Sequence, residues 1–228
     1  DEIRGKGSYQ AAIKALEMMQ PLRKQFKNFG VSVSMTCNRM NEDYLPDVFK
    51  ELESSGKVDQ VNIGFVRGNP KNLATKRVAV EKYRKLTNLK LESLKNNSLK
   101  YPNLFMNRFV SGKDYYTYKT VEDIYVNDHY VLPCQSGSLM GILYDDGNVY
   151  PCEILEDSCI GNIRDFDYNL PKLWAAHLGE KMRTQIRDGC YCTFECAMSS
   201  NILFNPKYIA KIAAKQIIPP ITKLNLKK

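Results

Sequence analysis

Five cysteines in the C-terminal half of the chain fall into two groups, and their spacing constrains the fold more than any other feature of the sequence. Cys134 and Cys152 are separated by seventeen residues, and Cys190, Cys192 and Cys196 follow in the pattern Cys-x-Cys-x3-Cys. The chain is long for a secreted disulfide scaffold, and its seven cysteines are an odd number. Two tight groups of thiols are instead typical of metal or cluster ligation.

A β-hairpin is predicted between the first two of these cysteines. Two short apolar strands, expected at residues 139–144 and 148–152, flank the turn sequence Asp145-Asp146-Gly147. Asp-Gly between apolar strands is a strong hairpin signal, and glycine permits the tight turn. We expect the hairpin to bring Cys152 back beside Cys134.

Four cysteine thiolates can hold a cubane iron–sulfur cluster, so five candidates leave one to spare. Within the second group we favour Cys192 and Cys196 as ligands and Cys190 as the extra thiol. Structural zinc competes for the same thiolates, although zinc ribbons usually present two Cys-x2-Cys knuckles. Inert buried thiols are a third interpretation. Cys37 and Cys159 stand apart, and we interpret them as core or surface thiols.

The first hundred residues predict an alternation of helices and strands. That order is typical of a parallel βα architecture, either a barrel or a doubly wound sheet. Two strands cannot close a barrel, and the sequence begins at Asp1 without Met, so we expect a fragment whose other strands lie upstream. The helices are expected at 8–28 (with Ser8 as N-cap), 43–55, 73–88 and 89–95, and the strands at 31–36 and 58–66.

Four segments follow from this pattern: 1–100 as barrel material, 101–130 as a linker, 131–205 as a cysteine-rich α+β domain, and 206–228 as a basic helix and tail. Residues 101–131 are rich in Tyr and Asn with weak periodicity, so irregular structure is predicted there. One helix is expected over 170–186, carrying Trp174, and another over 206–218.

The formal net charge of +8 raises the question of an anionic partner. From Pro206 to Lys228 there are six Lys and no acidic residue. A solvated basic face explains such a balance, and no nucleic-acid reader motif accompanies it. No apolar run approaches the roughly 18 residues that span a bilayer. We therefore expect a cytoplasmic protein without nucleic acid as a partner and without stable membrane insertion.

The cysteine pattern resembles a known family. Cys134, Gly147-x4-Cys152 and then Ile160-Gly161-Asn162-Ile163 are similar to the SPASM/twitch domain of radical SAM enzymes. The stretch Asp1-Glu2-Ile3-Arg4-Gly5 resembles the segment after the fourth barrel strand of those enzymes. Residues 31–38 and 58–67 resemble their fifth and sixth strands. The resemblance covers nearly the whole chain.

The resemblance implies the C-terminal part of a partial (β/α)6 radical SAM barrel, followed by a small α+β SPASM/twitch domain. It implies an enzyme that uses S-adenosylmethionine and a [4Fe–4S] cluster to generate a 5′-deoxyadenosyl radical and modify a substrate. A peptide or protein side chain is the favoured substrate, and a small molecule or carbohydrate is the alternative. An auxiliary [4Fe–4S] cluster would belong to this chain, and a reductant such as flavodoxin or ferredoxin would be a partner.

Cofactor-binding candidates lie at the ends of the two predicted strands, where barrel enzymes bind ligands. They are Ser34, Thr36, Asn38, Arg67 and Gly68, and Arg67 could pair with a cofactor carboxylate. The Cys-x3-Cys-x2-Cys motif of the catalytic cluster is absent, so we expect the chain to be inactive alone. The absence of a cysteine after Cys196 favours one auxiliary cluster, the twitch-like case.

A second hypothesis is a non-enzymatic zinc module that binds nucleic acid or a protein partner through its basic segments. The colour and metal content of the purified protein would discriminate the two hypotheses.

Overall fold

The computed structural model describes residues 4–96, 98–99 and 104–217, and it divides into two compact units. Unit 1 comprises Asp1–Val66 and Asn72–Ser111, and unit 2 comprises Arg67–Lys71 and Gly112–Lys228. The expected loop at Asp1–Ile3 and the basic tail beyond residue 217 lie outside the described residues.

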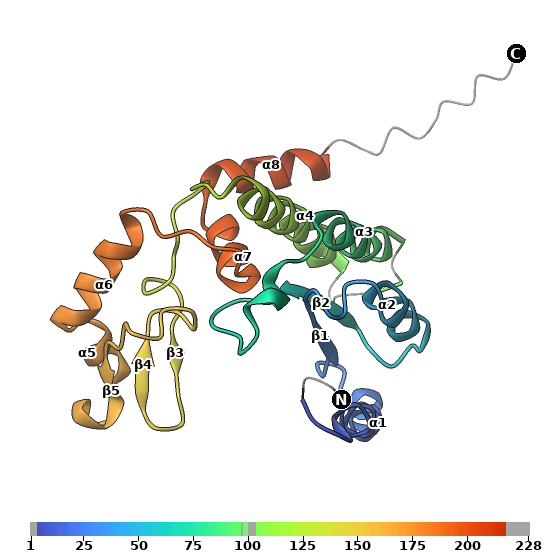
Figure 1. The fold of residues 1–228 in the computed structure, drawn as a ribbon, viewed down its shortest axis with the longest axis horizontal. Coiled ribbons are helices and arrows are strands. Elements are labelled where there is room, and N and C mark those ends of the chain that lie inside the picture. The colour runs from blue at the N-terminus through green and yellow to red at the C-terminus, as the bar shows by residue number, and fades with distance from the viewer. Residues whose placement is uncertain (1–3, 97, 100–103, 218–228) are drawn as a thin grey trace, which may run out of the picture. The chain divides into compact units, whose positions relative to one another are not determined.

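Unit 1 is built on two parallel strands (Figure 1). β1 (Ser32–Cys37) pairs with β2 (Gln60–Phe65) in a register that places Ser34 opposite Asn62. Both strands lie where the sequence predicts them. The barrel itself stays a prediction, because the described part of unit 1 contains these two strands.

One side of this strand pair is packed and the other is polar. Met35, Cys37, Ile63 and Phe65 are buried, whereas Ser34, Thr36 and Asn62 on the opposite side are exposed. The alternation follows from the period of two along a strand.

Helices precede, connect and follow the two strands: α1 (Ser8–Gln25), α2 (Leu45–Ser54) and α3 (Val80–Asn96). Pro21 lies inside α1 without dividing it, and Gly7 occupies the N-cap, so the expectation of Ser8 as N-cap is wrong. A 3₁₀ turn at Leu73–Lys76 precedes α3, which therefore begins later than predicted and runs on through residues 89–95 without a break.

The prediction of irregular structure over residues 101–131 is wrong, because α4 (Leu104–Asn127) is a helix of 24 residues. Its buried positions follow helical spacing, yet several carry polar side chains. Asp114, Thr117 and Thr120 are buried beside Val121 and Ile124. The polar residues hide the periodicity that hydropathy would otherwise show.

Unit 2 contains a small antiparallel sheet in the order β3-β4-β5 (Figure 1). The predicted hairpin is confirmed by the pairing of β3 (Ile142–Leu143) with β4 (Asn148–Tyr150), and β5 (Gly161–Asn162) then pairs with β4. Gly147 has a φ of 87°, which is the left-handed conformation that the turn requires.

Four α-helices follow the sheet in the described part of unit 2. The predicted single helix over 170–186 is instead two, α5 (Leu170–Trp174) and α6 (His177–Arg187). The helices α7 (Glu195–Leu203) and α8 (Pro206–Ile217) follow, and α8 confirms the predicted C-terminal helix. One apolar core joins the sheet to α5 through Val149, Ile160, Ile163 and Leu173, with Phe166, Trp174 and Met182 packed against it.

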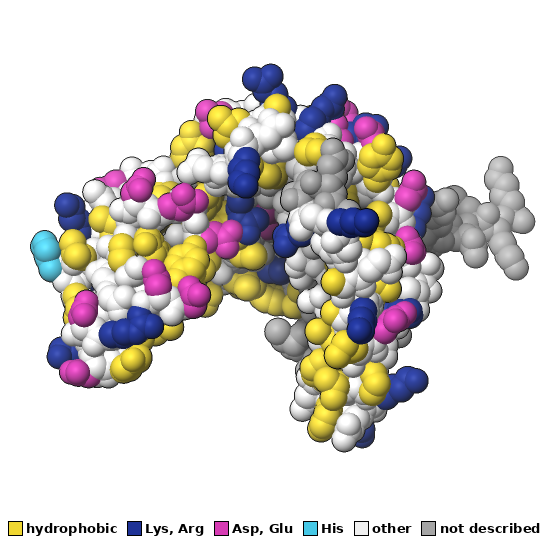
Figure 2. Space-filling model, turned by 60° about the horizontal axis from the view of Figure 1, so that its bottom comes forward, with side chains coloured by type: hydrophobic (Ala, Val, Ile, Leu, Met, Phe, Trp, Pro, Cys, Tyr) yellow, Lys and Arg dark blue, Asp and Glu magenta, His cyan; other side chains and the backbone are white. Residues whose placement is uncertain are grey.

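Basic and acidic side chains are interspersed over the face that Figure 2 draws. Several charged side chains of the described residues form ion pairs, such as Arg23 with Asp59 and Lys82 with Asp43. In the described part of the chain, no helix has the length and apolar character needed to cross a membrane.

Candidate metal centre

Three loops of unit 2 bring four cysteines together. Cys134 precedes the hairpin, Cys152 follows β4, and Cys190 and Cys192 lie between α6 and α7. The thiols of Cys134 and Cys190 share a hydrogen bond. Cys152 and Cys192 pack in one apolar cluster with Phe194. The charges of Cys134 and Cys152 both act on the thiol of Cys192, so the four side chains are mutual neighbours.

Backbone N–H groups approach three of these sulfurs in the same way. The N–H of Ser136 acts on the Cys134 sulfur, that of Ile154 on Cys152 and that of Phe194 on Cys192, and each of them acts to lower the pKa of its thiol. Each donor lies two residues after its cysteine. A hydrogen bond to sulfur stabilises the thiolate, which is the form that binds metal.

Two polar side chains adjoin Cys134. The Asn201 side chain on α7 hydrogen-bonds to the Cys134 sulfur, and its Oδ1 accepts from the N–H of Gln135 at 2.7 Å. The Ser136 hydroxyl is 1% exposed and makes no hydrogen bond of ordinary geometry, although it lies near enough to lower the pKa of both Cys134 and Cys152. A buried hydroxyl in this position can donate to a sulfur that gains charge.

Burial opposes ionisation of these thiols. It raises the pKa of Cys192 to about 11, and it raises the pKa of Cys152 above its usual value. The shared hydrogen bond lowers the pKa of Cys134 to about 5 and raises that of Cys190. One thiolate is therefore favoured in the group, and four together require a cation that neutralises their charge.

Cys196 lies in a different environment. Cys196 is exposed as a residue, but partial burial of its sulfur raises the pKa of the thiol. The charges that act on it are those of Arg67, Glu195, Glu153 and Lys113. No cysteine is among these influences. The structure thus groups Cys190, and not Cys196, with the other three thiols, which differs from the sequence-based choice of ligands. Cys37 is buried in unit 1 and Cys159 is exposed, as the sequence suggests for isolated thiols.

Arg67 contacts two other residues of unit 2. Its Nε donates to Glu153 Oε1 at 2.6 Å, and its guanidinium lies 4.1 Å from the centre of the Phe194 ring. The neighbouring Gly68 has a φ of 67°. These contacts fix the loop after β2 to the segment that follows Cys152.

The other cofactor-binding candidates belong to unit 1 and divide into two environments. Ser34 and Thr36 are exposed on the polar side of the strand pair. Asn38 is buried, and its Oδ1 accepts from the N–H of Met40 at 2.8 Å. The Asn38 side chain therefore closes a turn, and the structure does not bring it beside Ser34 and Thr36.

In the part of the chain that the structure describes, no three His, Cys, Asp or Glu side chains are arranged to hold a single metal ion. Ligation at the four-cysteine site therefore requires a closer approach of the loops. The donor set nevertheless fits a thiolate-bound cluster, because it provides four cysteines, backbone donors to sulfur and an unpaired buried hydroxyl.

Comparison of the chain with protein-family models, with curated proteins and with solved structures gave no match. The case for a function therefore depends on the residues of the site itself.

Sequence reasoning missed Ser136 and Asn201. The position of Ser136, two residues after Cys134, is a signal that could have identified it. Asn201 is 67 residues from Cys134 in sequence and has no such signal.

Proposed function

We propose that unit 2 is an iron–sulfur domain in which Cys134, Cys152, Cys190 and Cys192 are the ligands. One observation carries the proposal: the four thiols gather in one place, and a backbone N–H two residues on is directed at the sulfur of Cys134, Cys152 and Cys192. Donors that approach sulfur favour the thiolate, which is the form that binds metal.

In this proposal the protein supplies position and electrostatics. The hairpin turn sets the distance between the Cys134 and Cys152 loops, and α7 holds the Cys134 loop through Asn201. The Ser136 hydroxyl donates to a ligand sulfur once that sulfur is charged. A [4Fe–4S] cluster bound by these residues would supply one-electron transfer or an iron atom that orients a substrate.

We further propose that the chain is the C-terminal part of a radical S-adenosylmethionine enzyme. This rests on the sequence resemblance, and the parallel strands of unit 1 and the cysteine hairpin of unit 2 are compatible with it. The polar face with Ser34 and Thr36 would then face S-adenosylmethionine, and Arg67 would act as a structural residue. A peptide side chain as substrate and a flavodoxin or ferredoxin as reductant complete this proposal.

The test is the iron, sulfide and zinc content of the anaerobically purified chain and of single cysteine-to-alanine variants. We expect about four iron and four sulfide per chain. C134A, C152A, C190A and C192A should lose them, whereas C196A and C159A, as matched controls, should retain them.

One zinc per chain without sulfide would overturn the proposal and favour the zinc-binding module. Iron that survives in C190A but not in C196A would keep the cluster and overturn the ligand assignment.

A further inference from the structure

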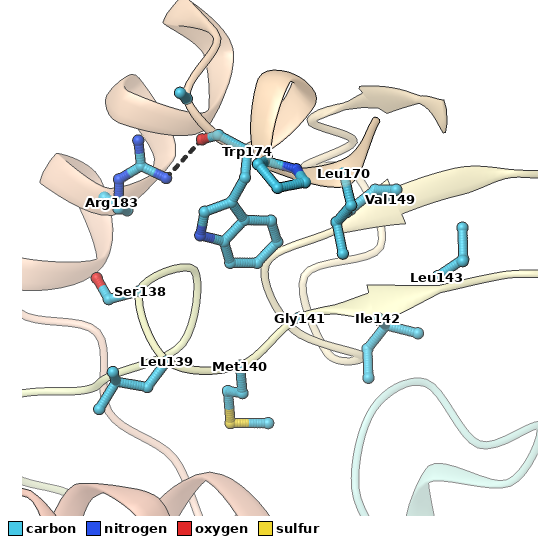
Figure 3. A pocket seen from close by; sticks show the side chains of 12 residues that line it. Ser138, Leu139, Met140, Gly141, Ile142, Leu143, Val149, Leu170, Trp174 and Arg183 are labelled. Atoms are coloured by element: carbon cyan, nitrogen blue, oxygen red, sulfur yellow. Dashed lines mark hydrogen bonds between the residues drawn. The ribbon is translucent and has the colours of Figure 1, made fainter. Parts of the chain in front are cut away.

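A second feature of unit 2 is a cavity of about 640 Å³ between the hairpin and α5. Its size is within the range of roughly 300–1,000 Å³ that is typical of ligand sites. The walls are mostly apolar and include Leu139, Leu143, Leu170 and Trp174. In Figure 3 the indole of Trp174 points into the cavity, above the chain from Leu139 to Gly141.

Gly141 makes the shape of this cavity possible. A Cβ atom at this position would collide with the Trp174 ring and lie 3.0 Å from the Tyr150 carbonyl oxygen. The absence of a side chain lets the indole rest against the backbone of the hairpin.

The outermost strand of the sheet contributes to this cavity, because Ile142 and Leu143 of β3 are among its lining residues. Within the described residues β3 pairs with β4 alone, so its other side has no strand beside it. Tyr144 N–H donates to Asn148 O at 3.0 Å, and Leu143 lies opposite Val149 in the next pair. Hydrogen-bonded and non-hydrogen-bonded pairs alternate in an antiparallel ladder, so the N–H and C=O of Leu143 point away from β4.

The charges around the cavity are compensated within the protein. Arg183 donates to the Trp174 carbonyl oxygen at 2.9 Å and to Glu180 at 2.7 Å (Figure 3 shows the first of these bonds). The guanidinium is therefore engaged, and the cavity offers an apolar surface with backbone donors and acceptors at its rim. An isolated apolar molecule would use the surface and leave the strand edge unpaired.

We propose that this cavity is a docking site for an extended peptide segment that adds to the edge of β3 and inserts a bulky apolar side chain beside Trp174. An extended peptide is the ligand class that satisfies both features, because its backbone pairs with an open edge while one side chain enters a pocket. The inference rests on the cavity and the strand edge, and it does not depend on iron.

One residue of the cavity lining also contacts the cysteine loops. Met140 lines the cavity and also packs against the cluster of Cys152, Phe194 and Ala197. A peptide held at β3 is therefore bound beside the candidate metal centre.

The test uses three acetylated and amidated pentapeptides. The first is Ser-Thr-Phe-Thr-Ser, the second has Ala in place of Phe, and the third is the first with N-methyl groups on the two Thr nitrogens. Trp174 is the single tryptophan of the chain, so its emission reports occupancy of the cavity directly. Titration calorimetry on the same chain of 228 residues gives the affinities.

We expect the Phe peptide to bind and to shift Trp174 emission, and the Ala and N-methylated peptides to bind about tenfold more weakly or less. The variant L139S removes an exposed apolar wall residue and should weaken binding of the Phe peptide. L178S is the matched control, because Leu178 is a similarly exposed leucine of unit 2 outside the cavity lining.

Three results would overturn the inference. The first is no binding of the Phe peptide by a folded chain. The second is equal binding of the N-methylated peptide, which would assign the cavity to an isolated apolar group. The third is a stable dimer in light scattering that L143D dissociates, because a second copy would then occupy the edge. Iron content is measured in parallel, so failure of this inference and failure of the proposed cluster are seen separately.

Discussion

The hydroxyl of Ser136 is buried beside the sulfurs of Cys134 and Cys152, and a charged sulfur would accept its hydrogen bond. In the structure it has no hydrogen bond of ordinary geometry, and an unpaired buried hydroxyl costs about 1–3 kcal/mol. That cost is offset where the hydroxyl donates to a thiolate ligand.

We therefore expect S136A to have opposite effects in the two states. In the metal-free chain the free energy of unfolding should stay the same or rise by about 1 kcal/mol, because an unpaired polar group is removed. In the iron-loaded chain the affinity for iron should fall roughly tenfold. Urea unfolding and competition with a chelator measure the two effects. S138A, at an exposed serine, is the control, and equal loss of stability in both states would contradict this account.

Substitution of Arg67 tests whether this residue has a structural role or binds a cofactor. Its ion pair with Glu153 is partly exposed, and its guanidinium stacks on Phe194, so R67M should lower the free energy of unfolding by about 1 kcal/mol. Iron content should not change. An undiminished stability together with weakened binding of S-adenosylmethionine would show instead that Arg67 contacts the cofactor.

At the residue scale the iron–sulfur site stays a prediction, and the structure bears on which cysteines lie near one another. Spacing alone divides the five cysteines into two groups along the sequence, but it does not show toward which neighbours each thiol points. Cys190 follows α6, and its N–H still donates to Ile186 O at 3.1 Å, so the end of that helix turns its thiol toward Cys134. Cys196 lies in the first turn of α7 and is exposed.

At the scale of elements, the turn of the hairpin sets the position of Cys152. A Cβ at Gly147 would collide with the Arg164 guanidinium and lie 2.8 Å from Asn162 Oδ1, at a φ that is unfavourable for other residues. We expect G147A to lower the free energy of unfolding of unit 2 by about 2 kcal/mol. Iron content should fall as well, because the cysteine loops lose their register.

G56A provides the comparison for this prediction. Gly56 has a φ of 64° and open space around its Cα, so alanine there adds backbone strain without a collision and should cost about 1 kcal/mol. Both variants are measured by denaturant unfolding followed by circular dichroism. Equal losses in G147A and G56A would show that the packing around the turn contributes little.

Two elements show why local sequence patterns were insufficient. In α4, Asp114 and Thr117 occupy buried positions where hydropathy expects apolar residues, so the helix was not recognised. Between α5 and α6, the Trp174 carbonyl oxygen accepts from Arg183, and Ala176 is extended with a ψ of 159°. That contact joins residues nine positions apart and replaces a helical hydrogen bond, which periodicity cannot anticipate.

At the scale of the whole molecule, the two units should respond differently to metal. Ligand binding stabilises the folded part that contains the site. The proposed ligands all belong to unit 2, whereas the parallel strand pair of unit 1 has an exposed face that is unusual for parallel sheets.

We predict that iron loading slows amide hydrogen exchange in residues 132–203 and leaves residues 31–66 unchanged. Exchange measured by mass spectrometry on loaded and metal-free chain tests this, and the C192A variant is the control that should show no difference. Uniform protection of both segments would mean that the units unfold as one body.

The N–H donors at the cysteine loops have a consequence for how the sequence can vary. Because the donors at Ser136, Ile154 and Phe194 belong to the main chain, almost any side chain at these three positions preserves the hydrogen bond to sulfur. Proline is the exception, since it has no N–H. Drift in side-chain identity at positions 154 and 194 would thus leave the electronic environment of the thiols largely intact, while a single proline at either position would alter it without touching any cysteine.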